Sequence, residues 1–117
     1  MRIELWLDHG IGLVEPSGDL GEQQLPALRK ALFIAMRHSQ FWTVLIVEDE
    51  ITHVCPAAWR VVGFYARTCR ARGGELAVVS TDGKLRASGR ISELGVIHPA
   101  FSSLDVALDE LSGVVRR

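Results

Sequence analysis

The sequence has few of the features that mark membrane or secreted proteins. Its longest apolar runs, such as TVLIV and LAVV, are far shorter than the roughly 20 residues that a membrane-spanning helix needs. Its N-terminus alternates charged and apolar residues and does not form a signal peptide. We therefore expect a cytoplasmic protein that inserts into no membrane.

Net charge is almost absent as well. Thirteen Lys and Arg are balanced by fourteen Asp and Glu, which leaves a formal net charge of −1 at pH 7. This balance supplies no long-range field that would attract the phosphate backbone of a nucleic acid or anionic lipids. We expect neither nucleic acid nor a membrane surface as a partner.

Only two cysteines, Cys55 and Cys69, are present. If both lie on or beside one helix, their separation of fourteen positions places the thiols roughly 20 Å apart, which is beyond disulfide reach. Cys55 at a helix start could be a reactive thiol, but a buried apolar role is the commoner one for free cysteine. We expect two unpaired thiols with no catalytic function.

Residues for metal or covalent chemistry are not grouped in the sequence. No two histidines lie three or four residues apart on a predicted helix, and no cysteine pair has ligand spacing. No glycine-rich P-loop is present, and no acid and histidine stand at the spacing of a nucleophile and its base. We therefore expect no metal, no cofactor and no enzymatic activity. The histidines are His9, His38, His53 and His98.

What the sequence does contain is a regular alternation of strand and helix patterns over one domain, residues 1–117. Period-two and continuous apolar runs predict strands, and apolar residues spaced by three and four predict helices. The run Pro16-Ser17-Gly18-Asp19 predicts a turn that ends the second strand. The predicted strands cover 2–8, 11–15, 43–47, 75–81 and 96–100, and the predicted helices cover 24–38, Pro56 to Gly73-Gly74, 85–94 and 104–115.

This order, β-β-α-β-α-β-α-β-α, indicates an α/β fold in which about four helices pack on a mixed sheet of about five strands. The helix stripes that should face the core include Leu28 and Leu32 in the first helix and Trp59 and Cys69 in the second. Trp59 could instead anchor an interface at the rim.

The run LIVEDE is also typical of a phospho-receiver domain, in which an acidic pair beside a phosphoacceptor aspartate binds magnesium. In this chain the pair Glu48-Asp49 comes nearly halfway along, too late for the strand and helix pairs that must follow it. The strand ELAVVST has no acceptor aspartate. A solvated loop at Glu48 to Glu50 is the better interpretation, and the receiver remains the alternative from another functional class.

The whole chain resembles the sulphate transporter and anti-sigma factor antagonist domain, abbreviated STAS. The similarity lies in the hairpin, the turn GDLG, the strand VLIV before ITHVCPAAW, the ending ARTCRARGGELAVVS of the second helix, and ISELGVIHPAFSSLDVAL near the C-terminus. The resemblance implies a STAS fold and a non-catalytic, protein-binding role as an anti-sigma factor antagonist.

The chain departs from the family at the site that a kinase normally modifies. Family members carry Asp-Ser-Ser-Gly at the start of the second helix, and the anti-sigma factor, itself a kinase, phosphorylates the first serine. The matching positions here are Cys55, Pro56, Ala57 and Ala58, none of which has a hydroxyl. The resemblance therefore implies a phosphorylation site lost at Pro56.

We expect the chain to bind a protein partner through the turn after the hairpin and the start of the second helix. The resemblance implies an anti-sigma factor with serine kinase activity or, alternatively, the ATPase of a lipid transporter to which the chain would dock as an accessory subunit. Outward arginines of the second helix, among them Arg67, Arg70 and Arg72, are either a solvated face or a surface for an acidic partner. The predicted partner-binding residues are Gly18, Asp19, His53, Cys55, Pro56, Ala57, Ala58, Trp59 and Arg60.

Overall fold

The computed structural model describes residues 2–47, 51–79, 100–101 and 103–115. Apolar periodicity and capping produce the elements in these ranges, with a short 3-10 turn, η1, before the first helix. In chain order the elements are β1 (Arg2–Asp8), β2 (Ile11–Leu20), η1 (Glu22–Gln24), α1 (Leu25–His38), β3 (Trp42–Ile46), β4 (Ile51–Val54), α2 (Pro56–Ala71), β5 (Glu75–Val79), β6 (Ala100–Phe101) and α5 (Leu104–Val115).

The described strands form one mixed sheet in the order β1-β2-β3-β5-β6, and β4 pairs with β2 beside this path. β1 and β2 are antiparallel, whereas the pairs β2 with β3, β3 with β5, and β5 with β6 are parallel. Parallel neighbours require crossover connections, which α1 and α2 supply. The predicted α/β class and mixed sheet are confirmed.

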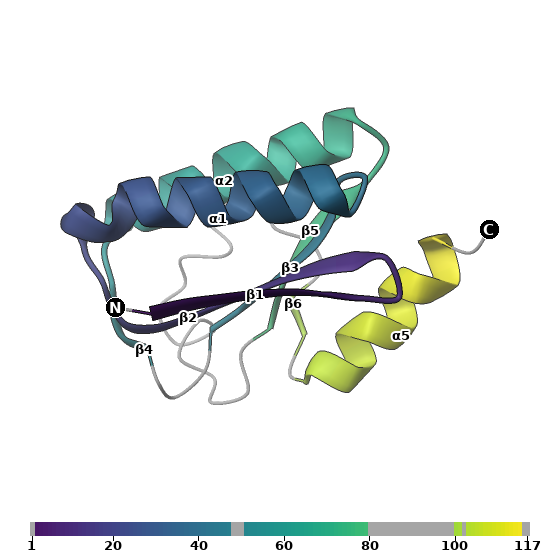
Figure 1. Cartoon of the computed structure of the whole chain (residues 1–117), viewed down its shortest axis with the longest axis horizontal. Helices are drawn as coiled ribbons and strands as arrows, with labels where there is room; N and C mark the ends of the chain where they lie inside the picture. The colour runs from purple at the N-terminus through teal and green to yellow at the C-terminus, as the bar shows by residue number, and fades with distance from the viewer. Residues whose placement is uncertain (1, 48–50, 80–99, 102, 116–117) are drawn as a thin grey trace.

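Helices cover both faces of the sheet. Figure 1 shows α1 and α2 side by side above the sheet and α5 below it. The core between the sheet and α1 with α2 is the larger and includes Leu28, Leu32 and Trp59, while α5 seals a second core with Ala107 and Leu111. The parallel strands β3 and β5 are buried on both faces of the sheet, which explains their unbroken apolar runs.

The described helices α1, α2 and α5 form where the sequence predicts helices. Leu28, Leu32 and Met36 of α1 are buried, spaced by four residues as the inward stripe of a helix requires. Pro26 is tolerated because it lies in the first turn. At the start of α5 the Ser103 hydroxyl accepts a hydrogen bond from the Val106 amide at 3.2 Å and so caps the helix.

Two glycines allow close approach between layers. A Cβ on Gly12 of β2 would lie 2.7 Å from the Ala35 carbonyl oxygen of α1. A Cβ on Gly74 would lie 2.0 Å from the Phe41 carbonyl oxygen. Since side chains do not fit at such distances, these glycines set the spacing of α1 and of the α2–β5 connection against the sheet.

The predicted turn at 16–19 is wrong. β2 continues to Leu20, and Gly18, at φ +90°, lies at a bulge in its pairing with β4. Pro16 is accepted in mid-strand because β3 pairs only with residues 12–14 and β4 only from Gly18 onward. No parallel ladder among the described residues therefore needs the amide hydrogen that proline lacks.

The strand β4 was not predicted. Its four residues follow an acidic run and are too short to show a clear alternation, so they give little sequence signal. The predictions of a loop at 48–50, a helix at 85–94 and strand residues at 80–81 and 96–99 lie outside the described residues. No described helix combines the length and the apolar character that crossing a bilayer requires.

Candidate partner-binding site

The structure brings the two predicted parts of the site together at one end of the sheet. β2 and β4 run parallel, with Gly18 paired to Ile51 and Asp19 paired to His53. The chain then passes directly from β4 into α2. The hairpin end and the helix start, more than thirty residues apart in sequence, therefore form one continuous surface.

A backbone hydrogen bond fixes this junction. The amide of Cys55 donates to the carbonyl oxygen of Leu20 at 3.0 Å, which ties the end of β2 to the first residue before α2. The Cys55 carbonyl in turn accepts from the Ala58 amide at 3.0 Å and starts the helix. Pro56 then takes the first helical position, where its fixed φ is already suited to a helix.

The first turn of α2 has no side-chain cap. Cys55 stands at the N-cap in an extended conformation, and its thiol makes no capping hydrogen bond. Cys55 is 8% exposed and belongs to the larger core, as the apolar interpretation predicted. Pro56 is exposed and Ala57 half-buried, so the surface of this turn consists of ring and methyl carbons. A phosphate has no oxygen to attach to at these positions.

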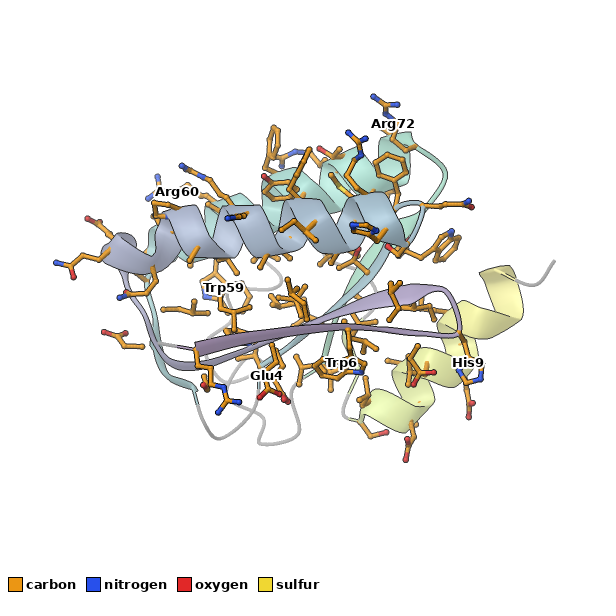
Figure 2. The ribbon with its side chains drawn as sticks, viewed as in Figure 1. Glu4, Trp6, His9, Trp59, Arg60 and Arg72 are labelled. Carbon is orange, nitrogen blue, oxygen red and sulfur yellow. The ribbon has the colours of Figure 1, made fainter. Side chains whose placement is uncertain are left out.

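Two of the predicted site residues turn inward. Trp59 is 4% exposed and Ala58 is completely buried, and both pack in the core beneath α1. Figure 2 shows Trp59 between the helices and the sheet, whereas Arg60 points away from the sheet. Trp59 therefore supports the site from within and is not an anchor at its rim. Among the site residues whose side chains the structure describes, Asp19, Pro56 and Arg60 are exposed.

A shallow groove between α1 and α2 extends the site. It has a volume of about 440 Å³ and adjoins the helix start through Ala57. The remaining lining residues include arginines and aromatic rings. Exposed Phe64 packs edge-on against Tyr65, with ring centroids 5.3 Å apart. The groove is lined by Arg29, Ala57, Arg60, Val61, Phe64 and Tyr65.

Sequence reasoning missed Arg29, Phe64 and Tyr65 as site residues. Phe64 could have been found, because it lies one helical turn from both Arg60 and Arg67 and so shares their outer face. It is 58% exposed and so is available for contact with a partner. Arg29 could not have been found, since only the packing of α1 on α2 places it beside Arg60.

The outward arginines divide into two groups. Arg70 bridges Glu75 at 3.3 Å, and the Arg72 guanidinium lies 5.5 Å from the centre of the Phe41 ring. Both therefore stabilise the end of α2. Arg60 and Arg67 are exposed and form no ion pair with any residue that the structure describes. Only this second group remains available to an acidic partner.

Both cysteines are buried. Cys69 is completely buried, and burial raises the pKa of its thiol to about 11, so it remains protonated at neutral pH. Neither cysteine is disulfide-bonded. No group of three or more His, Cys, Asp or Glu side chains within the described ranges could hold a metal ion.

Comparison with solved structures identifies the architecture. An anti-sigma factor antagonist from Mycobacterium paratuberculosis superposes with a TM-score of 0.79 at 18% identity, over 94% of this chain and 92% of that one. The chain has the STAS fold. No protein-family model and no curated protein matches the sequence.

Other anti-sigma factor antagonists share this STAS fold. A putative one from Thermotoga maritima has a TM-score of 0.79 at 16% identity, over 98% of this chain and 95% of that one. The antagonist SpoIIAA in its unphosphorylated form has a TM-score of 0.68 at 14% identity, over 96% and 99% of the two chains. The resemblance inferred from the sequence is thus confirmed at the level of fold.

Proposed function

We propose that this chain is a non-catalytic regulator of the anti-sigma factor antagonist type that binds its protein partner without a phosphorylation switch. The observation that carries the proposal is the start of α2. Residues 55–60 join β4 to α2, with Pro56 and Arg60 exposed, and they carry a thiol, a pyrrolidine ring and methyl groups where the resembling family has two serines.

The physical consequence is a site whose charge stays constant. A phosphoserine would add about −1.5 to −2 charges at the N-terminus of α2 and would change the affinity for any partner seated there. Cys55, Pro56 and Ala57 cannot carry this group. Binding at the junction therefore depends on the concentrations of the two proteins and not on a kinase.

The groove beside the junction determines the chemistry of the partner. Arg29 and Arg60 present guanidinium groups on either side of it, and Phe64 supplies an exposed apolar ring. Arginine and aromatic side chains are the residue types that most often dominate binding energy at protein interfaces. The partner should place a carboxylate and an apolar side chain in this groove.

The test combines partner capture with phosphorylation. The native protein and the double variant Pro56→Ser with Ala57→Ser are each mixed with the anti-sigma factor kinase of the source cell and ATP. Intact mass and affinity are then measured. We expect the native protein to gain no phosphate in residues 52–60 and to bind equally well before and after ATP.

The double variant is the matched control, because it restores hydroxyls at an exposed helix start. Phosphate on the native protein within residues 52–60 would contradict the proposal. Recovery of a transporter ATPase and no anti-sigma factor in a pull-down would also contradict it, and would favour the accessory-subunit alternative.

A further inference from the structure

The strand β1 exposes three consecutive apolar side chains at the edge of the sheet. Leu5 is 41% exposed, Trp6 39% and Leu7 54%. β1 pairs only with β2, and none of the described segments covers its other side. An apolar edge strand of seven residues invites pairing with another strand, and soluble proteins usually cover or charge such an edge.

The turn that follows β1 determines which backbone groups point outward. His9 and Gly10 have φ of 54° and 81°, as a two-residue type I′ hairpin requires. In such a hairpin the flanking residues Asp8 and Ile11 exchange both backbone hydrogen bonds. Hydrogen-bonded pairs then alternate along the ladder, so every second residue counted back from Asp8 bonds to β2.

The residues between them face away from β2. Ile3, Leu5 and Leu7 therefore present their N–H and C=O groups at the open edge. We propose that a second copy of this chain pairs with this edge, strand β1 against strand β1, antiparallel and centred on Leu5. Leu5 then lies opposite Leu5 of the second copy, and Ile3 lies opposite its Leu7.

The charged residues of β1 select this register. Pairing centred on Leu5 places Arg2 opposite Asp8 of the second copy, twice by symmetry. Sliding by two residues in one direction places Glu4 opposite Glu4, and in the other direction places Glu4 opposite Asp8. Opposite charges directly across a strand pair stabilise it and like charges destabilise it, so only the central register is favourable.

The ion pair that Arg2 already makes does not oppose this pairing. Arg2 contacts Glu4 at 3.0 Å, with 78% and 50% of the two side chains exposed. Pairs this exposed contribute little to stability, so Arg2 can turn to Asp8 of the second copy.

Both faces of the joined sheet would gain apolar contact. Leu5 is registered with Val14, on the side of α1 and α2, whereas Trp6 is registered with Leu13, on the side of α5. Figure 2 shows Trp6 on the side of β1 away from α1 and α2. Because the same strand pairs with itself, the contact closes at two copies and leaves no β1 edge open for polymerisation.

Cysteine crosslinking tests the register. In the proposed dimer, Leu5→Cys brings two thiols onto directly opposed residues, whose Cα atoms lie about 5.5 Å apart, within disulfide reach. Leu7→Cys is the control in the same strand, because its two copies are offset by four residues, roughly 13 Å. We expect mild oxidation to give at least about tenfold more covalent dimer from Leu5→Cys.

Sedimentation of the uncrosslinked protein supplies the second measurement. The native chain should sediment as a dimer and Leu5→Lys as a folded monomer by circular dichroism. Phe64→Lys should remain dimeric, because Phe64 is equally apolar but lies on α2. A monomeric native chain, or equal crosslinking of the two cysteine variants, would overturn the proposal. Neither outcome bears on phosphorylation at α2, so the two proposals fail separately.

Discussion

The two helical layers of this protein carry opposite charge. The helices α1 and α2 contain no Asp or Glu and six Lys or Arg. The helix α5, on the other face of the sheet, contains three acidic residues and no basic one. The basic residues are Arg29, Lys30, Arg37, Arg60, Arg67 and Arg70, and the acidic ones are Asp105, Asp109 and Glu110.

The net charge conceals this difference between the two layers. The formal sum of −1 predicted no long-range field that would attract a nucleic acid or anionic lipids. The molecule is 23 Å thick even along its shortest axis, whereas charges at physiological salt are screened over about 8 Å. A partner that approaches α1 and α2 therefore meets a basic surface, and one that approaches α5 meets an acidic surface.

The largest expected effect is on the free energy of unfolding, when a buried residue beneath α1 and α2 is compared with one beneath α5. Trp59→Ala should lower the free energy of unfolding by about 3 to 5 kcal/mol, because the indole is 4% exposed in the larger core. Leu111→Ala, in the smaller core under α5, should cost about 2 kcal/mol. Urea denaturation measures both. Exposed Phe64→Ala should change stability by less than about 0.5 kcal/mol, and a larger loss at Leu111 than at Trp59 would reverse the ranking.

A smaller effect is expected on the affinity for the partner, when charge is reversed on the exposed side of α2 or of α5. Arg60→Glu should weaken binding of the captured partner about tenfold or more, because it places a like charge against an acidic surface. Asp105→Lys, an equal change of charge on α5, should change the affinity less than about twofold. Isothermal titration calorimetry at low and high salt distinguishes them. Equal losses from the two variants would show that the partner does not select the basic layer.

The smallest effect concerns the thiol of Cys69 beneath α2. Between its ordinary pKa of 9.0 and its raised pKa of about 11, the unfolded chain releases the thiol proton and the native chain keeps it. Stability should therefore fall as pH rises through this window and should not depend on this group below it. Cys69→Ala should flatten the decline in melting temperature between pH 9 and 11. An unchanged slope would show that burial does not perturb this thiol.

Periodicity was sufficient to predict most of the fold. The helices α1, α2 and α5 and the strands β1, β3 and β5 follow apolar patterns long enough to indicate both their type and their buried side. The strand β4 was missed because its pairing with β2 is a contact between distant segments. The extension of β2 was missed because Pro16 and Gly18 are turn residues in most contexts, and only the gap between two parallel neighbours makes them acceptable in a strand.

Sequence patterns predicted a helix that starts at Pro56, and the structure places this helix start beside Gly18 and Asp19. Whether these residues bind a partner stays a prediction. The groove was beyond the sequence, because Arg29 and Phe64 come from different helices and their proximity depends on how α1 packs on α2. The inward position of Trp59 follows from its place on the α2 stripe.

Because β2 is long, it pairs with three other strands, β1, β3 and β4. Its first residues pair with β3, its last residues pair with β4, and residues 11–17 pair with β1. Arg2 is registered with Ser17, the neighbour of the bulge glycine. Detaching β1 would therefore remove the hydrogen-bonding partner of one flank of β2. Because the end of β2 holds Cys55 through the Leu20 carbonyl, a force applied to β1 would be transmitted through β2 to the start of α2.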